Sequence, residues 1–467
     1  MKKLILLLLL VNSQIVFAQE NPDRILSASA FMQIVNAYHP VVKQADIQID
    51  KSKAGIQLAR GLFDPLLETY LAEKTLDGVR YYRTIEPTIS IPTWYGVELS
   101  AGLASLNGNR INPSQTRGKT SFVGLSVPLA KNLLMDKRRA ALKTAKIYRE
   151  LSDVEKKTVV NNLILDAMVA YWQWVKAYHL YIVVSDAVIV NEKRLAFVKT
   201  AYQLGERPAI DTTETLAQLQ SFLYLQSENL LQLENAALEL SVFLWQNNGQ
   251  PVLMSGEVIP EQNLVAAVVS TRPLPLLEDI LLTAQQNHPK IREFDFKLKA
   301  LDVNRQLKFQ ELLPSINLKY NQLAKGYDIL KTVGIPLGDN NFQYGVSLSF
   351  PLRFLEGRGA YKMAKLKIDE TLLEQNLAKV TITNKIKTAL NKLATLQNQV
   401  TIQFGAYSNY MILQRGEETR FFNGESSLFL INTRETKALE ALQKLIELKA
   451  KYFETEILVQ WASGVLG

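Results

Sequence analysis

Apolar residues recur at alternating intervals of four and three along two long stretches of the chain. In the first stretch, eleven of the twelve positions spaced in this way are apolar. In the second stretch, 219 residues later, nine of the twelve are apolar. A period of 3.5 residues kept over such a length indicates helices that supercoil around neighbouring helices. The positions are Leu163, Ala167, Ala170, Trp174, Ala177, Tyr181, Val184, Val188, Asn191, Leu195, Val198 and Tyr202, then Ile382, Ile386, Ala389, Leu393, Leu396, Val400, Gln403, Tyr407, Tyr410, Gln414, Glu417 and Phe421.

Both helices are predicted to be very long. We place them at about 134–203 and 357–421. The first range contains neither proline nor glycine, and from Ala360 onward the second contains only Gly405 and Gly416. At about 1.5 Å per residue, each helix is on the order of 100 Å long. One compact core cannot bury such a helix, so each must lie along other long helices.

A tight turn follows each long helix. Gly205 and Gly424 suit the left-handed conformation in which helices commonly end. Pro208 cannot continue the first helix, and Asp211 or Thr212 can cap the next one.

Return helices are predicted after both turns, at about 211–247 and 427–463, so that each repeat contains a helical hairpin. Their apolar residues are again three and four apart. The stripes are Leu216, Leu219, Leu223, Gln226, Leu230, Leu233, Ala237, Leu240 and Leu244, then Ala438, Ala441, Leu445, Leu448, Tyr452, Thr455, Val459 and Ala462.

The chain presents the same order of features twice. His39-Pro40 recurs as His288-Pro289, 249 residues later, and an amphipathic stretch follows each pair. We therefore divide the chain into a first repeat at 19–247 and a second at 276–467, each with a helix, strands, a long helix and a return helix. The proline-rich segment 248–275 connects the two repeats.

Strand-like segments lie before each long helix, within about 65–128 and 314–351. They alternate apolar and polar residues, are rich in Val, Tyr, Phe, Thr and Ser, and are bounded by Gly, Pro and Asn. This alternation fits a membrane β-barrel wall between lipid and a wet lumen. A soluble sheet packed on the helices is the alternative. The first repeat has a surplus at about 76–103, which predicts an extra hairpin or a long outer loop.

The first residues predict secretion. Lys2 and Lys3 precede an apolar run, and small residues lead to a cleavage position after Ala18, as in a signal peptide at 1–18. The apolar run is too short to remain as a membrane-spanning helix.

The rest of the composition excludes several classes of protein. Without cysteine the chain can form neither a disulfide nor a thiolate metal site. The net charge of +8 comes from scattered residues, so no nucleic-acid surface is predicted. After the signal peptide, no apolar run reaches the length of a transmembrane helix.

No catalytic, cofactor or metal site is predicted, so we expect the chain not to be an enzyme. Two of the three histidines, His39 and His288, precede prolines at matching positions, where the start of a helix explains them. His179 stands alone on a long helix, and no His/Asp/Glu spacing suggests a metal.

The ordered set of features resembles the TolC-type outer-membrane efflux proteins over nearly the whole mature chain. This set is the double repeat, the strand segments ending in Pro-Leu, the long heptad helix, and the aromatic-x-x-Gly turn before a return helix. The resemblance implies a homotrimer with one β-barrel, about four strands per protomer, in outer-membrane lipid and one helical tunnel across the periplasm. It also implies an exit duct for efflux or type I secretion, with a periplasmic adaptor and an inner-membrane transporter as partners.

The residues independently favour an oligomer. About four strands leave two open edges, and unpaired backbone in lipid costs several kcal/mol per group, so the edges must pair with other copies.

The resemblance also places functional residues at the hairpin turns. It implies a contact with the adaptor at the tip, which here comprises Gly205, Glu206, Asp211, Gly424, Glu425 and Ser426. Helix capping explains Asp211 equally well. The acidic pair that lines the entrance in some members falls on Leu430 and Thr433 here. The acidic ring is therefore either missing or supplied by Glu417, Glu425 or Glu435, for which a solvated helix face is the alternative.

Two other functions compete with this interpretation. One is a periplasmic coiled-coil adaptor or scaffold without a pore, and the other is a soluble hydrolase of the cell envelope. Two hairpins and aromatic strands disfavour the first, and the lack of a catalytic site disfavours the second. Extraction separates them, because only the channel requires detergent.

Overall fold

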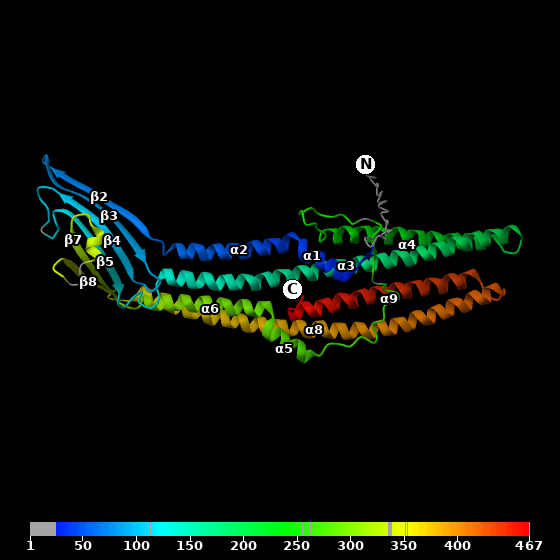
Figure 1. Cartoon of the computed structure of the whole chain (residues 1–467). Helices are drawn as coiled ribbons and strands as arrows, with labels where there is room; N and C mark the ends of the chain where they lie inside the picture. Colours follow the sequence, from blue (N-terminus) through cyan, green and yellow to red (C-terminus); the bar gives the residue numbers. More distant parts are fainter. Residues whose placement is uncertain are drawn as a thin grey trace, which may run out of the picture.

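The computed structural model describes residues 25–112, 114–254, 256–261, 263–334, 339–350, 352 and 354–466. The predicted signal peptide lies outside these residues. The molecule is a long rod, with a β-sheet at one end and the two hairpin turns at the other (Figure 1). The predicted fold class, mostly helical with a sheet portion, is confirmed.

Two long helices, α3 (Lys137–Gln203) and α8 (Leu355–Phe422), run along the rod. Helices α2 (Pro40–Gly61) and α6 (Pro289–Gln310) lie beside the halves of α3 and α8 that are nearer the sheet. Beside the other half lie the return helices α4 (Ala209–Ser241) and α9 (Leu428–Ser463). The shorter helices α1 (Ala28–Tyr38) and α5 (Leu277–Asn287) lie near mid-rod, where β1 (Ile25–Leu26) pairs with β6 (Ile259–Pro260).

The core follows the predicted stripes of the long helices. Every stripe position on α8 is buried or half-buried, and on α3 only Tyr202 is exposed. All eight predicted stripe residues of α9 are buried. At mid-rod, Trp172 stacks on Phe453 with 4.5 Å between ring centroids, beside the fully buried Tyr171. Since burial of a large apolar side chain contributes about 1.5–3 kcal/mol, these stripes hold the rod together.

The prediction for α4 is wrong in two respects. The helix begins at Ala209 and ends at Ser241, because Pro208 occupies the N-cap and the chain turns away to pair Trp245 with Pro251. Leu219 and Leu240 of the predicted stripe are buried, but the rest of the buried face is one position earlier than predicted, at Thr215, Phe222, Asn229 and Ala236. Leu216, Leu223 and Leu230 of the predicted stripe are exposed. The cause is that α4 packs mainly on one helix, α3, and a single contact buries only a narrow face.

The sheet contains six strands, two more than the expected four or so. Its order is β2-β3-β4-β5-β7-β8, and every neighbouring pair is antiparallel. The two additional strands, β2 and β3, form a hairpin, but it lies at 66–92 and only partly overlaps the surplus segment predicted at about 76–103. Charged residues such as Glu68, Glu73 and Arg83 obscure the alternation there. The strands are β2 (Leu66–Leu76), β3 (Val79–Pro92), β4 (Glu98–Asn107), β5 (Gly118–Pro128), β7 (Ser315–Lys325) and β8 (Phe342–Ser349).

The His-Pro pairs begin helices, as predicted. His39 and His288 occupy the N-caps of α2 and α6, where their Nδ1 atoms accept hydrogen bonds from the backbone N–H groups of Val41 (3.2 Å) and Lys290 (3.1 Å). A neutral imidazole is needed for this role, because a protonated one has no acceptor.

We expect His288 to make the fold less stable in acid. Burial lowers the pKa of His288 from 6.5 to about 4. The nearby carboxylate of Glu293 opposes this shift, and Lys385 and Lys290 add to it. Between these two values the unfolded chain binds a proton that the folded chain does not, so the free energy of unfolding decreases as the pH falls. The loss should be about 1–2 kcal/mol after solvent screening.

Thermal unfolding at pH 7 and pH 4.5 measures this loss, with His288→Asn as the comparison. Asparagine preserves a capping acceptor and does not titrate. The variant should lose less stability between the two pH values than the natural chain. Equal losses would remove His288 from the explanation.

Among the residues that the structure describes, no helix combines the length and the apolarity that a membrane crossing requires.

Candidate functional site

The register of the sheet gives it one apolar face. Residues directly opposite each other in antiparallel strands point to the same side. Leu71 of β2 lies opposite Ile85 of β3, and Leu99 of β4 lies opposite Leu125 of β5. Similar pairs extend through β7 to β8. The apolar residues of this face are Leu67, Leu71, Ile85, Ile89, Ile91, Leu99, Ala101, Leu103, Val123, Leu125, Val127, Ile316, Leu318, Tyr320, Tyr344, Val346 and Leu348. Toward the strand ends farther from the helices, the same face carries Glu73, Arg83, Ser105, Lys119 and Gln322.

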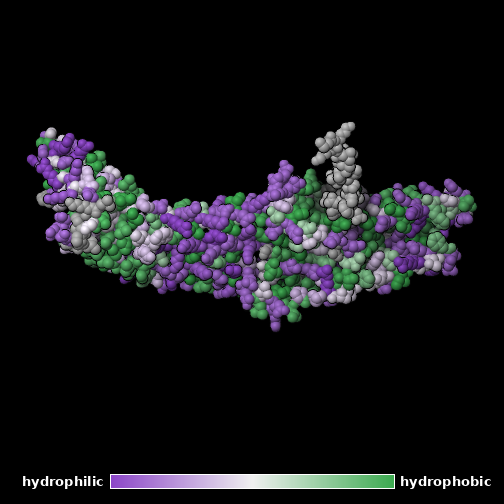
Figure 2. Space-filling model, in the orientation of Figure 1, coloured by the Kyte–Doolittle hydropathy of each residue, from purple (hydrophilic) through white to green (hydrophobic). Residues whose placement is uncertain are grey.

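Much of this apolar face is exposed in the single chain. Leu67, Tyr344 and Val346 are 71%, 68% and 62% exposed. Figure 2 shows an apolar area over the sheet end, next to a hydrophilic surface over the adjoining helices. Soluble proteins rarely expose a contiguous apolar area of this extent, and such an area marks a contact with membrane or protein.

The opposite face of the sheet is mostly polar or small. Its polar or small residues include Glu68, Glu86, Thr88, Ser90, Ser100, Gly102, Gly124, Ser126, Asn317, Lys319, Asn321, Gln343, Gly345, Ser347 and Ser349, and its larger apolar or aromatic ones are Leu66, Tyr70, Leu106, Phe122 and Leu323. One apolar and one polar face are what a wall between lipid and a water-filled lumen requires. Among the residues that the structure describes, the outermost strands, β2 and β8, each have one edge without a partner strand in the sheet.

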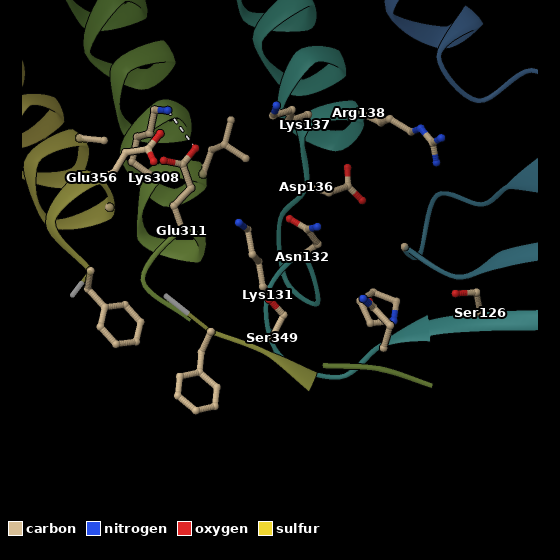
Figure 3. A pocket seen from close by; sticks show the side chains of 18 of the residues that line it. Ser126, Lys131, Asn132, Asp136, Lys137, Arg138, Lys308, Glu311, Ser349 and Glu356 are labelled. Atoms are coloured by element: carbon tan, nitrogen blue, oxygen red, sulfur yellow. Dashed lines mark hydrogen bonds and ion pairs between the residues drawn. The ribbon is translucent and has the colours of Figure 1, made fainter. Parts of the chain in front are cut away.

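A pocket of about 1080 Å³ lies where the sheet meets the helices (Figure 3). Ser126 and Ser349 of the polar face line it together with charged side chains from the starts of α3 and α8 and the end of α6. Lys308 binds Glu311 at 2.9 Å, and Arg138 binds Glu98 at 3.4 Å. The pocket therefore continues the polar face of the sheet onto the helices.

At the far end of the rod the two hairpin turns have the same backbone geometry. Gly205 and Gly424 have φ values of 77° and 79°, which glycine adopts without steric cost. In both turns the next residue donates a backbone hydrogen bond across the helix end, from Glu206 to Ala201 (2.9 Å) and from Glu425 to Arg420 (2.8 Å). These bonds are those of a Schellman motif.

A buried polar network joins the two hairpins close to these turns. Arg194 of α3 binds Glu435 of α9 through two nitrogens, at 2.5 and 3.2 Å. The two side chains are only 12% and 7% exposed. Asn191 donates to the same carboxylate at 3.1 Å, and Asn432 donates to Glu214 of α4 at 3.2 Å. We call these five residues the tip network.

Glu417 is also buried and paired. It accepts a hydrogen bond from the Ser426 hydroxyl, and Arg420 and Arg434 lie 3.5 and 4.0 Å from its carboxylate. Beside it, the guanidinium of Arg207, from the first hairpin turn, lies 4.0 Å from the ring centroid of Phe421. Phe421 packs in turn with Val198, Leu428 and Ile431. Apolar and cation–π contacts therefore join the two turns, whereas the ion pairs of Glu417 lie within the second hairpin.

Solved structures with the same architecture include outer-membrane channels. The CmeC outer-membrane channel of Campylobacter jejuni matches with a TM-score of 0.62 and 16% identity, covering 94% of this chain and 85% of that one. VceC, an outer-membrane protein of Vibrio cholerae, gives 0.63 and 13%, covering 94% and 96%. The MtrE outer-membrane channel of Neisseria gonorrhoeae gives 0.64 and 14%, covering 94% and 88%. The chain has the outer-membrane-channel fold. No protein-family model and no curated protein matches the sequence.

This channel fold places the predicted tip residues in two groups. Glu417 and Ser426 come together, and Glu435 joins the tip network. Glu206, Glu425, Leu430 and Thr433 lie on the exposed surface of the tip. Asp211 lies in the first turn of α4, where it pairs with Arg207 at 3.3 Å instead of capping the helix.

Sequence analysis did not identify Arg194 or Asn191 as functional candidates. One signal was available, because Asn191 is the sole polar residue in the predicted stripe of the first long helix. Within the described part of the chain no group of three or more His, Asp or Glu side chains could hold a metal ion.

Proposed function

We propose that the chain is one subunit of an outer-membrane channel that provides an exit duct for efflux or type I secretion. The observation that carries this proposal is the two-faced sheet at the end of the helical rod. Its apolar face suits lipid, and its polar face continues into the polar pocket at the helix junction. The rod would cross the periplasm, and its tip would meet a periplasmic adaptor and an inner-membrane transporter.

The sheet requires other copies of the chain. Two edges without partners, on β2 and β8, cannot remain open in lipid, where each unpaired backbone group costs several kcal/mol. A homotrimer closes them. The exposed leucines of α4 support association along the rod, because Leu216, Leu223 and Leu230 recur every seven residues. That spacing is typical of a helix with a further helical partner.

We propose further that the tip forms the entrance of the duct. The arginines beside Glu417 and Glu435 compensate their charges, so neither residue can supply an open acidic ring. Of the predicted ring candidates only Glu425 is exposed. The entrance is therefore held closed by contacts between the hairpins. The turns, Gly205–Glu206 and Gly424–Ser426, project furthest and form the contact with the adaptor.

Planar-bilayer recordings test the proposed function. Trimers purified in detergent should conduct ions, both with the natural residues and in a Glu417→Gln/Glu425→Gln variant. If trimers conduct nothing even with both glutamates neutralised, or if the chain is extracted from cells without detergent, the channel is excluded.

A further inference from the structure

The β2–β3 hairpin is anchored at the same end of the sheet as the other strands. β2 begins at Leu66, directly after α2 ends at Gly61, and β3 returns to the helices at Pro92. There Trp94, in the turn before β4, stacks on Phe63 with 4.4 Å between ring centroids. The hairpin therefore leaves the helix junction and comes back to it. Its strands of 11 and 14 residues are long enough to cross a bilayer, which takes about 9–11 tilted residues.

The two faces of the sheet continue across the part of this hairpin nearer the helices, and farther out Glu73 and Arg83 lie opposite each other on the face of Leu71. Leu67 lies opposite Ile89, and Ile89 lies opposite Ala101 of β4, all on the apolar face. On the other face Glu68 lies opposite Thr88. A hairpin that projected into water beyond the membrane would have no need of one continuous apolar face.

The perimeter of the helical part agrees with six strands per protomer. Four helices of each chain, α2, α3, α6 and α8, lie in the half of the rod next to the sheet. Twelve helices about 9 Å apart give a ring about 108 Å around. Strands about 4.8 Å apart and tilted by about 40° take up about 6.3 Å each, so eighteen of them give about 113 Å. At the same tilt, twelve strands would give only about 75 Å, so the wall would narrow unless the strands tilted more steeply.

We infer that the assembled barrel has eighteen strands, with β2 of one copy paired to β8 of the next. This inference rests on the proposed function. As the first and sixth strands of an antiparallel sheet, β2 and β8 run in opposite directions, so the closing pair is antiparallel like the others. The backbone diameter is then about 36 Å, against about 24 Å for twelve strands. A barrel of this width admits a polymer, such as an unfolded polypeptide, in addition to small solutes.

Disulfide formation between copies tests the closing pair, since the natural chain has no cysteine. Cysteine is placed on β2 in turn, as Leu67→Cys, Thr69→Cys or Leu71→Cys, each combined with Val346→Cys on β8. At least one pair should produce covalently linked subunits in outer membranes after mild oxidation. The matched control combines Val346→Cys with Leu99→Cys, Ala101→Cys or Leu103→Cys on β4, and none of these should link.

If Val346→Cys forms disulfides with the cysteines on β4 and with none on β2, the eighteen-strand barrel is excluded. The proposed channel function would not be affected by that result. Absence of links from both scans would overturn the barrel, and with the trimer also absent it would overturn the proposed function.

Polymer exclusion measures the width independently of the tip. Two proteins are compared in planar bilayers: the full chain and a variant that lacks residues 66–92. The deletion retains both Phe63 and Trp94. Polyethylene glycols of increasing size are added on the barrel side of the bilayer. The full chain should admit larger polymers, and its barrel should have at least twice the cross-section of the variant's. Identical cut-off sizes would show that the hairpin is not part of the wall.

Discussion

Replacing Glu435 with glutamine is expected to open the proposed entrance. The substitution leaves the Arg194 guanidinium buried without its carboxylate, which costs about 3–5 kcal/mol in a buried pair. Because this pair joins α3 to α9, the substitution raises the free energy of the closed state, in which the two hairpins are in contact. A shift of that size raises the open-to-closed ratio by more than about a hundredfold. Single-channel recordings should show openings that are long-lived in the variant and rare in the natural channel.

Two further variants show whether the ion pair is the cause. Arg194→Met combined with Glu435→Leu removes both charges, and such replacements are often neutral or stabilising, so the double variant should stay closed. Glu447→Gln removes an exposed pair with Lys444 on the same helix and should change nothing, because exposed pairs contribute little. If the double variant opens as readily as Glu435→Gln, lost packing and not an unpaired charge explains the opening.

The sequence predicted the helical part well, because burial along a supercoiled helix has a period that the residue order reveals. The stripe of α9 was correct at all eight positions, since α9 packs against both α8 and α3. On α4 the same rule chose Leu216, Leu223 and Leu230, which are exposed in the single chain. An apolar stripe indicates that a helix has partners, but it does not say whether the partner is in the same chain.

The strands were harder to predict for a physical reason. In a sheet with one polar face, half of the side chains carry no hydrophobic signal, and a strand such as β2 with Glu68, Glu73 and Lys74 resembles a loop. Only the register shows that Leu67 and Leu71 continue the apolar face of the neighbouring strands.

The candidate tip site was predicted in part. Matching turns at Gly205 and Gly424 located the end of the rod, because glycine there has a backbone requirement that the sequence shows. The pairing of Arg194 with Glu435 joins residues 241 positions apart, and no local pattern marks it. Two of the polar residues in the stripes of the long helices, Asn191 and Glu417, are buried. Asn191 takes part in the contacts between the hairpins, and Glu417 lies beside them.

A single charge on the apolar face of β8 is expected to prevent assembly in the membrane. In Val346→Arg the guanidinium points to the side shared with Leu318, which we assign to lipid. An arginine near the middle of a bilayer-facing strand costs about 2–4 kcal/mol in each copy, and a trimer bears that cost three times. The fraction of the chain recovered as detergent-extracted trimer from outer membranes should fall to a small part of the natural amount.

The adjacent position is the matched control, because successive residues of a strand face opposite sides. In Ser347→Arg the same side chain enters the polar face, opposite Asn317, and trimer recovery should be close to natural. The pair of variants also separates the membrane barrel from a soluble sheet. Val346 is 62% exposed in the single chain, so in water its replacement by arginine would cost little. A large loss at 346 with none at 347 therefore requires lipid on the apolar face, whereas two tolerated substitutions would contradict the barrel.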